Sequence, residues 1–437
     1  MLEGVNVALG VTGSIAAVKT VELAHELRRQ GASVRAVMTD SARGILHPWA
    51  VEFATEHDVV TEITGRVEHV ELCGREGWAD VLLVAPATAN TVGKIAGAVD
   101  DTPVTTCATT ALGAGVPVVV APAMHEPMYD HPGVLDALAR LEEWGVTYAD
   151  PRIEEGKAKI ASEDAVVTEL ARATTPDSLA DQHVVVTAGA TSEVIDPIRT
   201  LTNRASGTTG RAVARACYVR GADVTLVHDG DDVHYADTRQ VESAAEMLAA
   251  VQSAVSGNGA TDTDGSGGGS DPDQATADDA PTRSESATSA GEEPTRREAE
   301  PTTTDAHDQP ADALVSAAAI SDFTVEAHDE KIRSGESLTL ELEPTPKLLD
   351  TVRDEHPDLT MVGFKAETSG DDDAMVEAAR SLRDRVGLAF VVANDASVMG
   401  ETETRALFVD DADPTAFVGS KVALGGAVAD RLAGVLV

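Results

Sequence analysis

The stretch Val118–Tyr129, VVVAPAMHEPMY, begins as an apolar strand and ends in a loop of small and polar residues. A second stretch, Val81–Asn90 (VLLVAPATAN), has the same build: an apolar run, then Ala-Pro, then small polar residues. Continuous apolar runs of this kind are typical of parallel strands that are buried on both faces. Ligands bind beyond the carboxyl ends of strands in open α/β sheets, so the two Ala-Pro ends predict two sides of one pocket.

A glycine turn precedes both stretches. The strand Val5–Leu9 leads into Gly10–Lys19 (GVTGSIAAVK) and a helix expected over Ile15–Gln30. The helix N-terminus offers backbone N–H groups and a favourable dipole to a phosphate. The next strand, Ser33–Met38, is followed by Thr39, whose hydroxyl either caps a helix or reaches a ligand held at the glycine turn. This alternation of strands and helices predicts a parallel, doubly wound α/β sheet.

Composition limits the partners of the chain. Its 437 residues are 43% apolar, enough for two or three domains with full cores, and no apolar run approaches the length of a membrane span. The net charge of −41 disfavours binding to nucleic acid or to an anionic membrane, and indicates a salty cytoplasm, as in halophilic archaea. Three cysteines and the absence of a signal-peptide pattern at the start favour a reducing, cytoplasmic location.

A second α/β unit is expected after a polar stretch near residues 173–181, which predicts domains at 1–175 and 182–437. Val184–Thr191 reads as a strand and a glycine turn, followed by a helix over Thr209–Arg220 and a strand over Val224–Val227. This βαβ pattern predicts a second doubly wound, Rossmann-like domain.

An acidic insertion interrupts the second unit. Residues 256–310 contain mostly Gly, Ser, Thr, Asp, Ala and Pro, so they cannot bury a core and are predicted to be disordered. They separate a helix expected over Ala244–Val255 from a strand expected over Ala313–Ala319. The composition leaves a tethering or solubility role open.

Several motifs together resemble a known family. GVTGSIAAVK, VMTDSA (Val37–Ala42), APATANTVGKIAGAVDD and APAMHEPMY resemble the flavin-dependent cysteine decarboxylases, whose domain is flavodoxin-like. TAGATSEVIDPIRTLTNRASGTTG, in the second half, resembles the ligase signature of bifunctional coenzyme A biosynthesis enzymes. Those enzymes join a phosphopantothenoylcysteine decarboxylase to a phosphopantothenate–cysteine ligase. The resemblance covers nearly the whole chain except the insertion.

In the first half, the resemblance implies an FMN site and two catalytic histidines. His69 matches the histidine that handles the substrate carboxylate and thiol, and His125, where many members have Asn, matches a carboxylate-binding position. The residues implied to hold FMN are Gly13, Ser14, Ile15, Thr39, Pro86, Ala87, Thr88, Asn90 and Met124.

The chain departs from this family in one catalytic group. Bacterial relatives carry, on a flexible clamp, a cysteine that protonates the enethiolate intermediate, but Arg152–Ile160 contains no cysteine. Cys73, Cys107 and Cys217 all lie elsewhere. The final proton therefore needs another source, and Lys157, Lys159, His125 and water stay open.

In the second half, the resemblance implies a CTP site with Mg²⁺. Asn203 matches the residue that steadies the acyl-nucleotide intermediate, and Lys331 matches a lysine that meets the triphosphate. Asp322 is placed to face the nucleotide or its Mg²⁺, which makes it the implied metal ligand. The residues implied to bind CTP are Ser316, Ala317, Ala318, Asp322, Lys331, Pro346, Lys347, Leu348, Leu349, Phe364, Arg383 and Arg385. Thr208 departs from the usual lysine of the signature.

The implied function is a two-step synthesis. The ligase half would join L-cysteine to 4′-phosphopantothenate through an acyl-cytidylate, and the decarboxylase half would convert the product to 4′-phosphopantetheine. Decarboxylase domains of the family form trimers with flavin at the subunit interfaces, and ligase domains form dimers. The resemblance therefore implies a homo-oligomer, up to a combined dodecamer.

An alternative is a non-catalytic flavin-binding regulatory subunit, which the missing cysteine favours. A decarboxylase of peptide C-terminal cysteine is a third reading. The His69 motif and the ligase half weigh against the regulatory subunit, and the fused ligase weighs against the peptide decarboxylase, because it makes a small-molecule substrate.

Overall fold

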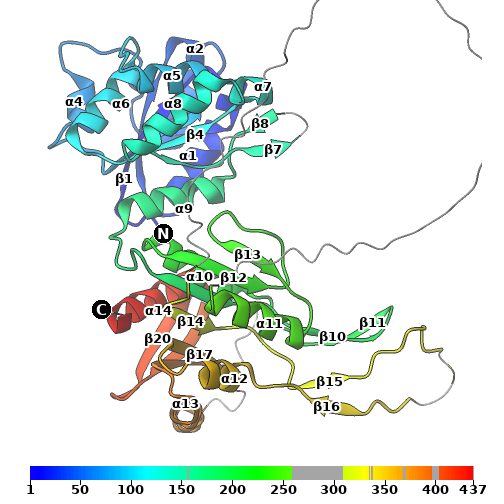
Figure 1. Ribbon diagram of the computed structural model, residues 1–437. Helices are drawn as coiled ribbons and strands as arrows, with labels where there is room; N and C mark the ends of the chain where they lie inside the picture. Colours follow the sequence, from blue (N-terminus) through cyan, green and yellow to red (C-terminus); the bar gives the residue numbers. More distant parts are fainter. Residues whose placement is uncertain are drawn as a thin grey trace, which may run out of the picture.

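The chain folds into two α/β units. The computed structural model describes residues 1–154, 157–257, 309–333, 335, 338–367, 371–395 and 403–436, and Figure 1 shows the two units with helix α9 (Glu163–Thr174) between them. The insertion predicted at 256–310 lies outside the described residues except at its two ends. At those ends, the backbone N–H of Ala311 donates to the carbonyl of Val255 at 3.0 Å, so the chain closes directly across the insertion.

The first unit is a five-stranded parallel sheet in the order β2-β1-β3-β4-β6. This is the flavodoxin-like order, so the predicted fold is confirmed. The strands are β1 (Asn6–Val11), β2 (Ser33–Met38), β3 (Val81–Ala87), β4 (Val118–Pro122) and β6 (Thr147–Tyr148). The two Ala-Pro stretches form the adjacent strands β3 and β4, as expected.

Helices cover both faces of this sheet with apolar side chains. One face packs against α1 (Thr20–Arg29), α3 (Pro48–Thr55) and α9. The other face packs against α4 (Glu68–Cys73), α5 (Ala89–Ala96), α6 (Pro103–Ala114) and α8 (Pro132–Glu143). Two short helices, α2 (Asp40–Arg43) and α7 (Glu126–Tyr129), follow β2 and β5 (Met124–His125). The helix predicted over Ile15–Gln30 begins as a 3₁₀ turn, η1 (Ile15–Lys19), a common form for the start of an α-helix.

The second unit has an eight-stranded sheet in the order β13-β12-β9-β14-β17-β18-β19-β20. Its first six strands are parallel in the Rossmann order, and β19 and β20 extend the edge in antiparallel fashion. The strands are β9 (His183–Thr187), β12 (Asp223–His228), β13 (Asp237–Gln240), β14 (Ala313–Ser316), β17 (Thr360–Glu367), β18 (Phe390–Asp395), β19 (Glu403–Val409) and β20 (Thr415–Ser420). The predicted Rossmann-like fold is therefore confirmed.

Helices α10 (Thr208–Val219) and α14 (Lys421–Leu436) cover one face of this sheet, and α11 (Ala244–Val255), α12 (Leu348–Glu355) and α13 (Asp372–Val386) cover the other. The strand expected to run to Ala319 ends at Ser316. Beyond it the chain follows the glycine turn after β9, where the N–H of Ala319 donates to the carbonyl of Gly189 at 2.9 Å.

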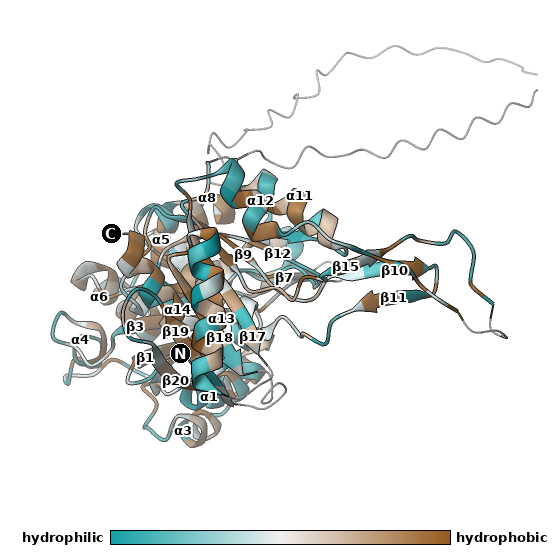
Figure 2. Ribbon diagram, turned by 90° about the horizontal axis from the view of Figure 1, so that it is seen from below, coloured by the Kyte–Doolittle hydropathy of each residue, from teal (hydrophilic) through white to brown (hydrophobic). Residues whose placement is uncertain are grey.

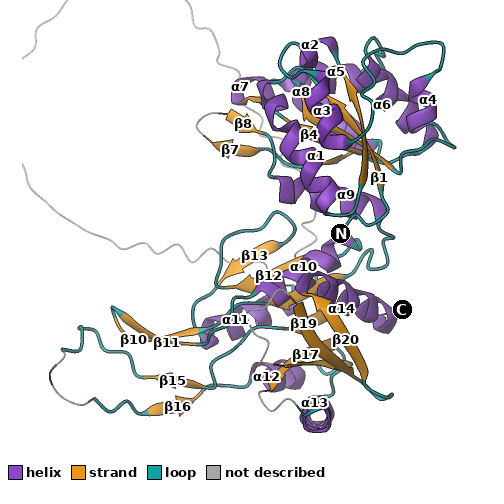
Figure 3. Ribbon diagram, turned by 180° about the vertical axis from the view of Figure 1, so that it is seen from behind, coloured by secondary structure: helices purple, strands orange, loops and turns teal. Residues whose placement is uncertain are grey.

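Two hairpin-like arms project from the second unit, as Figures 2 and 3 show. One arm pairs β10 (Ser192–Asp196) with β11 (Arg199–Thr202), and the other pairs β15 (Phe323–Val325) with β16 (Leu342–Pro344). The arms expose the large apolar side chains of Val194, Ile198, Phe323, Leu338 and Leu342. Exposed apolar groups gathered on projecting elements indicate a surface for association.

The two units contact each other through α9 and α10. The Tyr218 hydroxyl donates to the carboxylate of Glu169 at 2.8 Å, and the guanidinium of Arg172 lies 4.2 Å from the centre of the Tyr218 ring. Arg215 forms an ion pair with Asp164 at 2.7 Å. Burial raises the pKa of Glu169, an effect that the Tyr218 hydrogen bond and Arg172 oppose.

Among the described residues, no helix combines the length and the apolar character needed to cross a membrane.

Candidate active sites

The first candidate site lies where β1 and β3 diverge, the switch point at which flavodoxin-like sheets bind their ligand. Gly13 lies in the turn after β1, in close contact with the loop after β2. A Cβ atom on Gly13 would lie 2.5 Å from the Cβ of Ser41, so no side chain fits there. Ile15, in the first turn of the following helix, is 77% exposed. The turn therefore combines exposed backbone with an apolar side chain, which suits the phosphate and the ring of a flavin.

Hydrogen bonds tie the turn after β1 to the ends of β3 and β4. The Thr12 hydroxyl donates to the carbonyl of Pro86 at 2.6 Å, and the Ala85–Pro86 peptide is cis. The Ser14 hydroxyl donates to the carbonyl of Ala123 at 3.2 Å and accepts from the N–H of Ala16. Three segments from separate parts of the sequence are thus held together at one edge of the sheet.

Thr39 and Thr88 both cap helices in this region. The Thr39 hydroxyl accepts from the N–H of Ala42 at 3.2 Å, and the Thr88 hydroxyl accepts from the N–H of Thr91 at 3.2 Å. The predicted helix-capping role of Thr39 is therefore confirmed, and its hydroxyl also lies 3.4 Å from the hydroxyl of Ser41. Asn90 is exposed in the first turn of α5, two residues after Thr88.

His125 lies beside the clamp segment. Its strand β5 pairs with β8 (Lys157–Lys159), which pairs in turn with β7 (Arg152–Glu154). The backbone register sets Met124 opposite Ala158 and His125 opposite Lys157. The segment that the sequence resemblance aligns with a clamp therefore pairs, through its backbone, with the strand that carries the predicted carboxylate-binding residue.

His69 lies apart from His125 within one chain. It is on α4, whereas His125 directly precedes α7, and Figures 1 and 3 both place α4 and α7 at opposite sides of the first unit. The Nδ1 atom of His69 is buried, and no described residue forms a hydrogen bond with it. The structure does not bring the two predicted catalytic histidines together in a single copy.

The three cysteines lie in the cores. Cys73 and Cys107 belong to the core beneath α4 and α6, and Cys217 belongs to the core beneath α10, each with a free thiol and no exposed surface. Burial raises the pKa of Cys217 to about 12. The pKa of Cys107 is also raised, first through a hydrogen bond with Cys73 and then through burial. None of these thiols faces the clamp segment.

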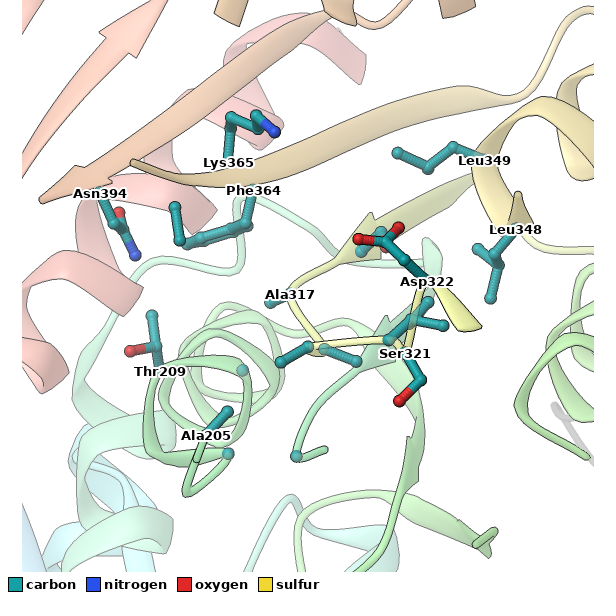
Figure 4. Close-up of a pocket in the computed structure, with 18 of the residues that line it drawn as sticks. Ala205, Thr209, Ala317, Ser321, Asp322, Leu348, Leu349, Phe364, Lys365 and Asn394 are labelled. Carbon is teal, nitrogen blue, oxygen red and sulfur yellow. The ribbon is translucent and has the colours of Figure 1, made fainter. Parts of the chain in front are cut away.

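The second candidate site is a cavity of about 850 Å³ at the carboxyl edge of the second sheet. Its walls come from the loops after β9, β11 and β14, from the carboxyl-terminal parts of β17 and β18, and from the N-termini of α10, α12 and α14. Figure 4 shows Phe364 and Asn394 on one wall, Ala205 and Thr209 at the start of α10, and Asp322 on the loop after β14. The Oδ1 atom of Asn394 is buried, and no described residue forms a hydrogen bond with it.

Glycines shape the cradle at the start of α10. Gly207 caps the helix with φ +67, and a Cβ atom there would lie 2.8 Å from the backbone nitrogen of Gly189. A Cβ atom on Gly210 would lie 2.5 Å from the Cβ of Ala188. The helix N-terminus and the glycine turn therefore meet without side chains between them, an arrangement that suits an anionic group.

Positive charge gathers around this cavity although the chain is strongly acidic. The lining contains five basic residues, Arg204, Lys347, Lys365, Arg385 and Lys421, and two acidic ones, Asp322 and Asp350. Lys347 contacts Asp322 at 2.5 Å, and Arg385 pairs with Asp350. The whole chain has 33 basic and 74 acidic residues, so this excess of positive charge is local.

The structure gathers most of the predicted nucleotide-binding residues in this cavity. They are Ser316, Ala317, Ala318, Asp322, Pro346, Lys347, Leu348, Leu349, Phe364 and Arg385. Arg383 lies outside the lining and contacts Asp384 and Asp411. Asn203 borders it, since its side-chain amide donates to the carbonyl of Ala319 at 2.9 Å, and Lys331 lies beyond β15 on the projecting arm.

The sequence analysis assigned no individual binding role to several lining residues: Arg204–Gly210, Lys365, Asn394, Thr404 and Lys421. Arg204–Gly210 could have been predicted as binding residues, because glycines before a helix start are typical of anion sites. No sequence pattern pointed to Lys421, because only the tertiary fold brings the start of α14 to the cavity.

Both halves match known families. Residues 1–175 match the family described as Flavoprotein, and residues 179–261 and 296–435 match the DNA/pantothenate metabolism flavoprotein C-terminal domain. The chain is 43% identical to the coenzyme A biosynthesis bifunctional protein CoaBC of Thermococcus kodakarensis over 93% of this chain and 89% of that protein. It is 31% identical to the protein of the same name from Bacillus subtilis, over 92% of this chain and 88% of that protein. A solved structure, the FMN-dependent cysteine decarboxylase SpaF, is 32% identical over 40% of this chain and 100% of its own, with a TM-score of 0.36.

Fold, cavity and matches define a flavoprotein whose second half is a Rossmann-like unit with a polar cavity. The chain belongs to the family of bifunctional coenzyme A biosynthesis proteins.

Proposed function

We propose that this coenzyme A biosynthesis enzyme first joins L-cysteine to 4′-phosphopantothenate with CTP and then decarboxylates the product with FMN. The chain carries both a ligase half and a decarboxylase half. The observation that carries the proposal is the locally basic cavity, because both CTP and 4′-phosphopantothenate bring phosphate groups. The glycine cradle at the start of α10 receives one of these phosphates.

Phe364 and Asn394 are suited to hold the nucleobase. The ring of Phe364 offers an apolar face, and the side-chain amide of Asn394 can hydrogen-bond the edge of a cytosine. Asp322 supplies the protein carboxylate for Mg²⁺, which commonly binds one or two carboxylates together with substrate phosphates. The described residues contain no group of three or more His, Cys, Asp or Glu that could hold a metal ion by themselves.

Asn203 and Lys331 complete the ligation chemistry. Asn203 borders the cavity through its contact with Ala319, where an amide can steady the acyl-nucleotide. Lys331 reaches the triphosphate from an arm that projects away from its own unit, so a second copy completes the site. The exposed apolar side chains on the arms support such a dimer.

The first half acts on the cysteinyl product. The glycine turn and the Pro86–Asn90 loop hold the flavin, which supplies the oxidation and returns the electrons. His125 binds the substrate carboxylate and His69 receives the thiol proton. Because α4 and α7 lie on opposite sides of the unit, His69 of one copy would meet His125 of another, as in a trimer of first halves. Trimers and dimers together would form a dodecamer.

We place the division between the two activities at residues 175–182 and the enzyme in the reducing cytoplasm. Support for the division comes from the separate cores of the two units. Support for the compartment comes from the three free thiols.

Two substitutions test the division of labour. Lys331→Gln should abolish CTP-dependent ligation and leave decarboxylation of supplied phosphopantothenoylcysteine intact, because the residue lies only on the ligase arm. His69→Asn should do the reverse. Separate assays of CMP release and CO₂ release measure the two steps. Loss of both activities in either folded variant would contradict the proposal.

A further inference from the structure

The β10–β11 arm contains a buried carboxylate that the proposed chemistry does not use. Asp196 ends β10, and its side chain has 0% exposed surface. A buried carboxylate is costly unless hydrogen bonds satisfy it, so its partners indicate what it holds in place.

The partners of Asp196 come from two distant parts of the chain. Its Oδ1 atom accepts from the backbone N–H groups of Ile198 at 2.8 Å and Arg199 at 3.0 Å, which shapes the hairpin turn. Its Oδ2 atom accepts from the Arg199 guanidinium at 2.5 Å and from the backbone N–H of Ile332 at 3.1 Å. One carboxylate therefore joins the β10–β11 turn to the segment beyond β15.

Arg199 completes this link. The same Nη1 atom that contacts Asp196 donates to the carbonyl of Ile332 at 3.1 Å. Both backbone polar groups of Ile332 are thus held, one by Asp196 and one by Arg199. The N–H of His328 also donates to the carbonyl of Ile195 at 2.9 Å. The segment is anchored on both sides of Lys331, whose own side chain is exposed.

We propose that Asp196 is a positioning residue for ligation and that it acts by fixing the backbone beside Lys331. The inference rests on the proposed role of Lys331 in ligation. A long lysine side chain has many rotamers, so a fixed backbone at Ile332 limits where the ammonium group can reach. Asp196 itself is buried and lies outside the cavity lining of its own copy.

Asp196→Asn removes this anchor with little change in shape. The new side chain keeps one oxygen for the N–H groups of Ile198 and Arg199. Its amide nitrogen, however, faces the Ile332 N–H and the Arg199 guanidinium, which are both donors. The turn is kept while the Lys331 segment is released.

The test uses the full chain and follows ligation, CTP binding and proteolysis. Asp196→Asn should lower kcat for ligation on the order of 10²-fold, as expected for a displaced catalytic group, and leave the dissociation constant of CTP unchanged. Trypsin should cleave the Lys331–Ile332 bond faster in native Asp196→Asn than in the wild type. Decarboxylation of supplied phosphopantothenoylcysteine should stay at the wild-type rate.

Asp410→Asn is the matched control. Asp410 accepts from the N–H of Ala412 at 2.8 Å and pairs with Arg431, so it has the same kinds of partners without contacting the Lys331 segment. The ligation rate of the Asp410→Asn variant and the rate at which trypsin cleaves it after Lys331 should match those of the wild type. Normal ligation in Asp196→Asn, or an equal loss in Asp410→Asn, would overturn the inference while the loss in Lys331→Gln still stands. Normal ligation in Lys331→Gln would instead refute the proposed role of Lys331 and the inference with it.

Discussion

At the scale of single residues, each candidate site contains a glycine that lets two segments of the chain approach closely. Gly13 and Gly210 are both in contacts where a Cβ atom would lie 2.5 Å from a neighbouring side chain. One contact joins the first two loops of the flavin-type unit, and the other joins α10 to β9 in the nucleotide-type unit. A side chain is thus excluded at one close contact in each candidate site.

Gly13→Ala should yield a protein that does not retain flavin. The added methyl group would force the turn away from Ser41, and overpacking of this kind typically costs about 1–3 kcal/mol. Absorbance in the flavin bands of the purified protein and titration with FMN measure the effect. Gly113→Ala on α6 is the control, since a Cβ there meets nothing within 4 Å. Wild-type protein that stays colourless with added FMN would contradict the flavin assignment.

The source of the last proton is also a question about single residues. Replacing all three cysteines with serine or alanine should preserve decarboxylase activity, because each thiol is buried away from the clamp segment. Lys157→Ala or Lys159→Ala should still release CO₂ while an oxidised or enethiol product accumulates. General acids contribute ~10²–10⁴-fold, so product formation should slow by that order.

Mass spectrometry of the products, alongside CO₂ release, distinguishes these outcomes. The pairing of Lys157 opposite His125 makes His125→Asn a useful companion variant. Loss of the final reduction in a Cys73 variant alone would make Cys73 the proton donor instead.

At the scale of elements, helix α10 joins the two halves. Its N-terminus forms the cradle of the ligase cavity, and its last turns contact α9 of the first unit through Tyr218 and Arg215. The buried Glu169 lies in this contact, with a pKa that burial raises above its ordinary value. The helix contact therefore contains a group whose ionisation changes stability.

Glu169→Gln should remove a pH-dependent loss of stability. Because its pKa is raised in the folded state, the folded protein binds more protons, and the free energy of unfolding falls as pH rises above about 4.5. Glutamine keeps an acceptor for the Tyr218 hydroxyl without the charge. The variant should match the wild type below pH 4.5 and be more stable at pH 8 in thermal or denaturant unfolding.

Glu22→Gln is the control for this measurement, because that side chain is 71% exposed and should leave the profile unchanged. Lower stability of Glu169→Gln at pH 8 would show that the attraction to Arg172 outweighs burial.

The sequence predicted elements better than it predicted junctions. The apolar runs at β3 and β4 and the helix over Ala244–Val255 matched the structure closely, because their patterns are local. The strand expected to reach Ala319 was overestimated, because its last residues bond to the glycine turn after β9 and leave the β17 ladder. Lys421 was not found because only the tertiary fold brings the start of α14 to the cavity. The distance between His69 and His125 is likewise a property of the fold that no linear motif contains.

At the scale of the whole molecule, charge and assembly are linked. The net charge of −41 makes copies repel one another, and salt screens this repulsion within roughly 10 Å at 0.1 M. Both proposed active sites need a second copy, so we expect ionic strength to act on activity through association. Once salt screens the repulsion, the exposed apolar residues on the arms can hold two copies together.

Mixing two inactive variants tests this shared architecture. His69→Asn and His125→Ala should each lack decarboxylation alone, but chains refolded together should regain part of it, because one kind of interface keeps both native histidines. The measurement is CO₂ release after co-refolding, with separately refolded and then mixed variants as the control. No recovery in mixed oligomers of confirmed composition would mean that each copy uses only its own histidines.

The short bridge between Val255 and Ala311 has a practical consequence. Because the N–H of Ala311 donates to the carbonyl of Val255, the two flanking segments lie side by side, and we expect a short glycine connector in place of residues 258–308 to leave both activities unchanged. A fluorescent or affinity module whose own termini lie close together can be installed at the same point. The fused reporter would sit on the ligase half while leaving both chain ends free, which makes the assembly directly visible in living cells.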